Sequence, residues 1–301
     1  MKIGILGNNI DAGIINHTYD VKMGIDEETE GIFAETLLLD LSTDLPVANT
    51  CIAVQSLQVD KKLSEEFRRE LRLSPAKSHS YLYGFYNGGR FSQFLECNYS
   101  TRFMNENVGP NVGFSVGVGL GVRCKIIEAI PMLNIIQDAL MKMEYAGEVL
   151  LGITDGYEIC SVEFGHFFGL FSIYAEICKQ NTQEILEFCL GRETEIELFP
   201  DLSISCLVTK PPFPAPAFKN GRIEIPKSAE KHTWRVEMSN TDLIIVTAHG
   251  ANIYQTRDRI RLTLDNMKKY DADLQHRTDF GFKGKFLLES ETYERGFVRR
   301  Q

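Results

Sequence analysis

The stretch YAGEVLLGITDGYEICSVEFGHFFG, Tyr145–Gly169, decides the fold. Apolar and β-branched residues fill Glu148–Ile153, the turn signal TDG follows at 154–156, and Tyr157–Phe164 returns as a second strand. The stretch therefore predicts a β-hairpin. Near the end of the return strand, Glu163 stands in a row of Val, Phe and Gly residues. A buried carboxylate is costly, so a metal, a base or backbone donors must compensate it.

The same stretch resembles a segment of phosphoribosylamine–glycine ligase, a member of the ATP-grasp superfamily. In that family a Y-x-G-x-L hairpin leads into E-F-N-x-R-F-G, whose Glu and Asn hold magnesium on ATP. Here the motif reads EFGHFFG at 163–169, with Gly165 for the Asn and Phe167 for the Arg. The resemblance implies that Glu163 is a catalytic residue and the magnesium ligand. Water or a further carboxylate could complete the metal site, and the candidates are Asp155, Glu158 and Glu176.

A second segment, Thr101–Gly113 (TRFMNENVGPNVG), carries the next resemblance. The ligases have K-R, a short acidic and Gly-containing stretch, and then G-P-N-T-G-G-M-G. Glycine lets backbone N–H groups approach a phosphate, and a fixed arginine binds phosphate or carboxylate through two hydrogen bonds. The resemblance implies that Arg102 is catalytic and that a substrate-binding loop follows, with Gly109, Pro110, Asn111 and Gly113. Without the resemblance, the segment is a Pro- and Asn-containing turn beside a surface arginine.

The C-terminal part follows the order of the family's small last domain, which has V-T-A-x-G, a helix and then R-x-D-I-G. Here VTAHG stands at 246–250 and RTDFG at 277–281. The resemblance implies that Arg277 and Asp279 contact the substrate. The family's G-G-R before the first of these motifs is N-T-D at 240–242, so an acid stands where the ligases have a cation.

The N-terminal part matches the family weakly. KIGIL at 2–6 predicts a short buried strand, and the GNN that follows is not the G-x-G-x-x-G of a dinucleotide fold. A strand over 31–41 resembles the one that leads to the adenine, which implies that Glu35 and Leu37 face the nucleotide. Lys22 resembles the lysine that reaches the phosphates. Because Gly31 follows so soon, we expect a shortened lid and no complete Rossmann-like domain.

Hydrophobic periodicity and turn signals predict the remaining elements. Helices are expected at 61–73, 131–143, 181–191 and 252–270. Strands are expected within 81–95, around a turn at 87–89, and at 202–209, 222–225, 233–237 and 242–248. The helix at 131–143 should place Ile135 on its apolar face, and N-T-Q-E at 181–184 is a capping box.

Composition narrows the class of protein. The 301 residues are 44% hydrophobic and 24% charged, as in soluble globular proteins, and the net charge of −9 argues against nucleic acid or an anionic membrane as the main partner. No apolar run reaches the roughly 18–20 residues that span a bilayer, and the N-terminus lacks signal-peptide anatomy. Seven cysteines without a C-x-x-C pair indicate neither a disulfide framework nor a zinc site, so we expect a reducing cytoplasm.

The sequence predicts an α+β protein with an ATP-grasp-like antiparallel sheet and helices over 1–199, a small C-terminal α/β domain over 200–281 and a tail over 282–301. The implied activity is ATP-dependent ligation of small-molecule carboxylate and amine substrates through an acyl phosphate, with ATP and magnesium as cofactors. The chain is also compatible with a homo-oligomer. The alternative is an inactive ligase fold that binds a nucleotide or small molecule or serves as a scaffold. A third hypothesis is an unrelated α+β protein whose likeness to the ligases is coincidental.

Overall fold

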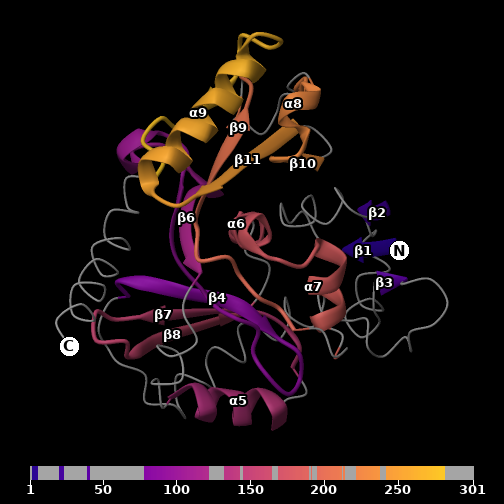
Figure 1. The fold of residues 1–301 in the computed structure, drawn as a ribbon, viewed down its shortest axis with the longest axis vertical. Coiled ribbons are helices and arrows are strands. Elements are labelled where there is room, and N and C mark those ends of the chain that lie inside the picture. Colours follow the sequence, from indigo (N-terminus) through magenta and orange to yellow (C-terminus); the bar gives the residue numbers. More distant parts are fainter. Residues whose placement is uncertain are drawn as a thin grey trace. The chain divides into compact units, whose positions relative to one another are not determined.

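The computed structural model describes residues 2–5, 20–23, 39–40, 78–121, 132–142, 145–164, 169–189, 191, 195–211, 213, 222–237 and 242–281. The chain forms two compact units (Figure 1). Unit 1 comprises 1–95, 122–167 and 178–198, and unit 2 comprises 96–121, 168–177 and 199–301. The predicted boundaries at 199 and 281 stay predictions, and the tail at 282–301 lies outside the described residues.

The N-terminal part of unit 1 contains a small three-stranded sheet. Its strand β1, Lys2–Ile5, pairs in parallel with β2, Asp20–Met23, and antiparallel with β3, Leu39–Asp40. The strand predicted at 2–6 is thus confirmed for 2–5. Lys22 lies on β2, whereas Glu35, Leu37 and the helix predicted at 61–73 lie outside the described residues.

The larger sheet of unit 1 contains the hairpin. Strands β4 (Ser80–Tyr86), β7 (Gly147–Ile153) and β8 (Ile159–Phe164) follow one another in the order β4-β7-β8, all antiparallel. The predicted hairpin is confirmed, but its return strand begins at Ile159 and not at Tyr157. Tyr157 has a φ of 57° and its N–H donates to the Thr154 carbonyl, so the turn extends through it.

Helix α5, Met132–Lys142, covers one face of this sheet and confirms the predicted helix. Its buried side chains, Leu133, Ile136 and Leu140, follow helical spacing. Ile135 lies outside this stripe and is 52% exposed, so its predicted place on the apolar face was wrong. The sheet contributes buried apolar residues to the same core: Leu82, Val149, Leu151, Ile153 and Val162.

Helix α7, Thr182–Cys189, begins at the predicted capping box. The Asn181 N–H donates to Glu184 Oε2 at 2.7 Å, and the Glu184 N–H donates to Asn181 Oδ1 at 3.0 Å. Gly191 follows the helix with a φ of 79°, a conformation that glycine adopts at low cost. Both predicted ends of the helix are therefore confirmed.

The turn predicted at 87–89 is also confirmed. Asn87 Oδ1 accepts from the N–H groups of Gly89 and Arg90, and Gly88 has a φ of 89°. The second strand does not follow directly, as had been predicted. After an isolated bridge between Tyr86 and Phe91, the next strand is β5, Leu95–Arg102.

Unit 2 contains antiparallel strands and helices. Its strands have the order β10-β11-β9-β6-β5, and β12 also pairs with β9. Their bounds are Asn111–Gly121 for β6, Leu202–Thr209 for β9, Thr233–Glu237 for β10, Asp242–Gly250 for β11 and Gln275–His276 for β12. The helices are α6 (Leu170–Ile177), α8 (Lys227–Glu230), α9 (Ile253–Lys268) and the short 3-10 helix η2 (Asn105–Asn107).

The strands predicted at 202–209, 233–237 and 242–248 are confirmed in unit 2, as is the helix predicted at 252–270. The strand predicted at 222–225 is wrong, because residues 222–226 have no regular structure and lead into α8. Asn111 and Gly113 had been placed in a loop but lie on β6, whose residues Phe114 and Val118 are buried.

The sheet of unit 2 has two chemically different faces. One face packs against α9, which lies along β9 and β11 (Figure 1), and its core residues include Val118, Ile204, Val246 and Ile260. Alternation turns the intervening residues to the other face, where α6 packs and where Ser203, Ser205 and Thr247 are fully buried. A polar layer therefore lies beneath α6.

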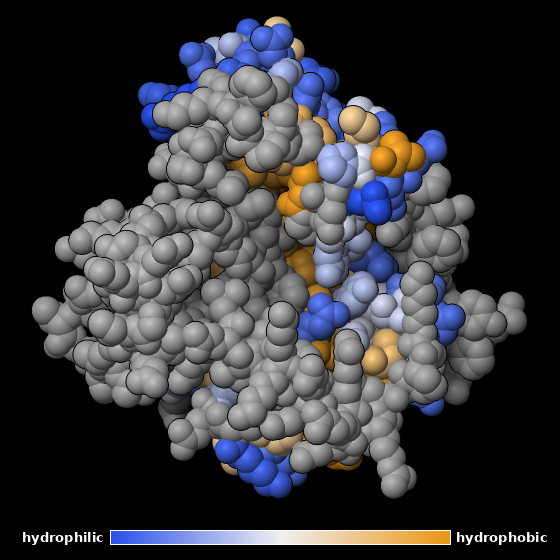
Figure 2. Space-filling model, turned by 180° about the vertical axis from the view of Figure 1, so that it is seen from behind, coloured by the Kyte–Doolittle hydropathy of each residue, from blue (hydrophilic) through white to orange (hydrophobic). Residues whose placement is uncertain are grey.

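The surface near the C-terminal end of α9 is mostly hydrophilic (Figure 2). Its exposed residues include Lys268 and Lys269. None of the helices within the described ranges is long and apolar enough to cross a membrane.

Candidate functional site

A cavity of about 420 Å³ lies within unit 2. Its lining comes from four segments: β5 at 98–100, the η2 turn at 106–107, β6 at 116–118, and residues 277, 279 and 281. A volume of this size falls in the range of small-molecule sites. Two of these segments, near 102 and near 277, are the ones that the sequence resemblance singled out.

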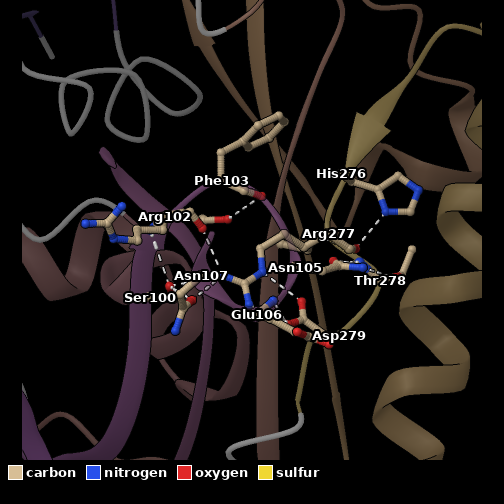
Figure 3. A network of polar contacts seen from close by, with 12 residues as sticks. Ser100, Arg102, Phe103, Asn105, Glu106, Asn107, His276, Arg277, Thr278 and Asp279 are labelled. Atoms are coloured by element: carbon tan, nitrogen blue, oxygen red, sulfur yellow. Dashed lines mark hydrogen bonds and ion pairs between the residues drawn. The ribbon is translucent and has the colours of Figure 1, made fainter. Parts of the chain in front are cut away.

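Arg277 is the centre of the polar network beside the cavity (Figure 3). Its side chain is only 5% exposed, and its Nε and Nη2 donate to the two carboxylate oxygens of Asp279. Nη1 donates to Asn107 Oδ1 at 2.6 Å, to the Arg102 carbonyl at 2.8 Å and to Ser100 Oγ at 3.0 Å. Asp279 therefore binds Nε and Nη2 of the guanidinium, and residues of β5 and η2 bind Nη1.

Further hydrogen bonds join η2 to residues 278–279. Asn105 Nδ2 donates to Thr278 Oγ1 at 2.8 Å, and the Thr278 N–H donates to Asn105 Oδ1 at 2.9 Å. The Glu106 N–H donates to Asp279 Oδ2 at 3.0 Å. Burial alone would raise the pKa of Asp279, but the hydrogen bonds from Arg277 and the Glu106 N–H outweigh it and hold that pKa below its usual value.

The η2 turn is held in an uncommon backbone conformation. Glu106 has a φ of 56° and Asn107 a φ of 61°, in the left-handed region that favours glycine. Asn107 tolerates this region better than most residues, and its side chain binds Arg277. Glu106 is the less usual residue here. Such outliers persist where surrounding contacts impose them and are common at functional sites.

The predicted loop residues lie close to this network. Arg102 is exposed and its Nη1 donates to the Gly109 carbonyl at 3.0 Å, while the Phe103 N–H donates to the Pro110 carbonyl at 3.1 Å. A β-carbon on Gly109 would lie 2.6 Å from the Met104 nitrogen, so glycine is required there. Bonds within unit 2 therefore bring Arg102, Gly109, Arg277 and Asp279 together, and their roles toward a substrate stay predictions.

Glu163 lies in unit 1, on β8, and is half-buried. Its partner in the register is Leu150, which in turn pairs with Tyr83 on β4. These three residues share the sheet face opposite to the one that packs on α5. Glu148 lies on the same face, with its Oε2 accepting from the Tyr83 hydroxyl at 2.7 Å. Sequence reasoning missed this second acid, although the alternation through β7 could have indicated it.

The three further carboxylates considered for a metal site have other surroundings. Asp155 pairs with His79 Nδ1 at 2.8 Å and is 82% exposed, and Glu158 is exposed. Glu176 lies in unit 2. Within the described ranges, no group of three or more acidic, histidine or cysteine side chains is arranged to hold a metal ion.

Glu176, a buried side chain on α6, is instead the centre of a cluster with two partly exposed histidines. Its Oε1 lies 3.0 Å from His232 Nδ1 and 2.8 Å from His249 Nδ1, and the Thr247 hydroxyl donates to Oε2 at 2.6 Å. Burial alone would raise the pKa of Glu176, but these hydrogen bonds lower it to about 2. The bond to Glu176 also raises the pKa of His249. The sequence gives no local signal for this cluster, because its members are far apart along the chain.

The arrangement of the antiparallel strands and helices agrees with a fold found among the ATP-grasp ligases. Within this class the chain resembles phosphoribosylamine–glycine ligase from Thermotoga maritima, with a TM-score of 0.55, 13% identity and coverage of 93% of this chain and 100% of that one. The predicted distant resemblance and fold class are thereby confirmed.

Two further solved structures are similar over most of their length. The phosphoribosylaminoimidazole carboxylase ATPase subunit from Aquifex aeolicus has 12% identity, a TM-score of 0.49 and coverage of 88% of this chain and 100% of that one. N5-carboxyaminoimidazole ribonucleotide synthetase from Thermotoga maritima has 10% identity, a TM-score of 0.46 and coverage of 92% and 99%. Neither score reaches 0.5, so the conclusion about the fold rests on the ligase. No family model and no curated protein matches the chain.

Proposed function

We propose that the protein is a ligase of the ATP-grasp type that joins a small-molecule carboxylate to an amine. The carrying observation is that parts of both segments selected by the resemblance, 106–107 of the first and 277, 279 and 281 of the second, line one cavity in unit 2. In this reaction the carboxylate oxygen takes the γ-phosphoryl group of ATP and ADP leaves. The amine nitrogen then attacks the acyl carbon, the bond to phosphate breaks, and the nitrogen loses a proton.

Magnesium would bind together with ATP. It is usually bound by one or two protein carboxylates, with nucleotide phosphates and water supplying the other oxygens. Glu163 fits this donor set as the predicted ligand, and Glu148 lies on the same sheet face. When bound, the metal offsets charge on the phosphoryl group during transfer.

The other predicted residues would bind and orient the reactants. Arg102 keeps donors on its exposed guanidinium besides the one that binds the Gly109 carbonyl, and these would position an acid or a phosphate. Arg277 and Asp279 would act by holding the η2 turn in place. The same proposal includes the predicted nucleotide contacts: Lys22 would reach the phosphates, and Glu35 and Leu37 would face the nucleotide.

Trapping of an acyl phosphate tests this function. With Mg-ATP, hydroxylamine and glycine as the first carboxylate, followed by a panel of small carboxylates, the protein should release ADP and form a hydroxamate. Glu163→Gln should slow this by a factor of about 100–1000. Asp138→Asn changes an exposed acid on helix α5 of the same unit and should leave the rate unchanged. The absence of ADP and hydroxamate with every carboxylate would contradict ligation.

A second candidate is an inactive ligase fold that binds a nucleotide or small molecule without turning it over. Gly165 and Phe167 favour it, because the family has a metal-binding Asn and an Arg at these positions. Each lost contact of this kind typically reduces the rate by a factor of about 100–1000. Such a protein would bind Mg-ATP in calorimetry and yield no hydroxamate.

For either function we propose a cytoplasmic location, which the free thiols of the five described cysteines support.

A further inference from the structure

The charge of the cavity in unit 2 differs from that of a site for anions. The charged residues among its described lining are Glu106, Arg277 and Asp279. Arg277 and Asp279 form a two-pronged ion pair, so they neutralise each other. Glu106 therefore sets the net charge of the lining, which is −1.

The carboxylate of Glu106 is available to a ligand. Its backbone N–H is bound to Asp279, and the residue is exposed. Among the residues that the structure describes, the Glu106 carboxylate has no hydrogen bond and no ion pair. The protein thus holds an acidic side chain beside the cavity at a φ of 56°, where glycine would be favoured.

The guanidinium of Arg277 cannot offer an anion the usual two-pronged contact. Its Nε and one N–H of Nη2 bind Asp279, and Nη1 has three oxygen acceptors within hydrogen-bond distance. A phosphate or carboxylate in the cavity would therefore meet the Glu106 charge without a compensating cation from the described lining. This arrangement disfavours anions.

The remaining lining combines an apolar wall with the polar residues Asn98, Ser100 and Asn107. Residues 116–118 of β6 contribute Val116, Gly117 and Val118, and Gly281 lies on the C-terminal segment. Tyr99 adds an aromatic ring. A cavity with an apolar wall and one acidic side chain matches an alkyl chain that ends in an ammonium group.

We propose that this cavity binds a primary or secondary amine in its ammonium form, with Glu106 as the counter-ion, and that it excludes carboxylates and phosphates. The inference rests on the proposed function, in which this ligand is the amine substrate. It assigns specificity for the amine to Glu106, a residue that the resemblance did not single out.

Three probes with the same alkyl chain test the proposal: n-butylammonium, butyrate and n-butyl phosphate. Each is titrated into the full chain without nucleotide, and binding is followed by NMR shifts of Tyr99 and Val116. Butylammonium should saturate these shifts at millimolar concentration, and the two anions should not. Glu106→Gln should weaken butylammonium binding by roughly tenfold, because the neutral amide loses the charge-assisted hydrogen bond. Glu224→Gln, an exposed acid of unit 2 outside the cavity lining, should bind as the unaltered chain does.

A second variant separates binding from folding. Glu106→Gly removes the carboxylate and relieves the positive φ, so it should raise the melting temperature while butylammonium binding is lost. Equal binding of butyrate or butyl phosphate at the same residues would overturn the proposal, as would unchanged affinity in Glu106→Gln. A protein that forms hydroxamate but does not bind butylammonium overturns this inference and leaves the proposed function standing. A protein that binds butylammonium but forms no hydroxamate overturns the proposed function and leaves the amine site standing.

Discussion

Replacement of Glu176 by Gln should cost the protein about 3 kcal/mol of unfolding free energy at pH 7. The Glu176 side chain is 6% exposed and its pKa falls from 4.5 to about 2, and a pKa shift of this size corresponds to about 3 kcal/mol of extra stability for the ionised form. The amide is isosteric but lacks the negative charge through which Glu176 raises the pKa of His249. The cluster links α6 to β11, so its loss should weaken the packing of α6 on the sheet.

The loss of stability in Glu176→Gln should depend on pH. Because the pKa of Glu176 is lowered on folding, its contribution is complete above about 4.5 and is lost as pH falls toward 2. The contribution of His249 is complete below 6.5 and is lost as pH rises through its raised folded pKa. The difference between the unaltered chain and Glu176→Gln should therefore be about 3 kcal/mol at pH 6 and close to zero near pH 2.

Urea unfolding followed by circular dichroism at several pH values measures this difference by linear extrapolation. Glu230→Gln changes an exposed acid of the same unit and serves as the control, with an expected change below about 0.5 kcal/mol. A Glu176→Gln variant as stable as the control at pH 6, or a difference that does not shrink in acid, would refute the account of the cluster.

Three further replacements should destabilise the chain by separate mechanisms. Gly169 has a φ of 80°, and in Gly169→Ala the added β-carbon would lie 2.4 Å from the Phe114 ring. This replacement should lower the unfolding free energy by about 2 kcal/mol or more. An unchanged melting temperature would contradict this packing. Asn181→Ala removes one half of the capping box and should cost about 1 kcal/mol in urea unfolding, with Asn181→Ser as the conservative variant that restores most of it. Arg277→Met leaves Asp279 without its ion pair and should cost about 3 kcal/mol, and a loss below 1 kcal/mol would show that the η2 network is not held by this residue.

The features that sequence predicted well depend on short-range rules. The hairpin around TDG and the capping box at Asn181 need only neighbouring residues, and both are confirmed. The turn at Asn87 follows for the same reason. At 222–225 the local signal was weak. Four residues with strand-like composition were not enough to predict a strand, because Pro226 follows them and caps α8.

The site could be predicted only in part. The resemblance selected Arg102 and Arg277, and the fold brings them together through the Arg102 carbonyl. It could not indicate that Arg277 is occupied by Asp279, because this follows from side-chain geometry. The strained Glu106 and the Glu176 cluster also depend on contacts between residues distant in sequence, for which a single chain carries no local pattern.

Calorimetric titration of the protein with Mg-ATP tests the central claim most directly. The account predicts that the unaltered chain binds the nucleotide with measurable heat, that binding requires magnesium, and that Glu163→Gln weakens it at least tenfold. No heat from the unaltered chain, or equal affinity in Glu163→Gln, would contradict a nucleotide site at the end of β8.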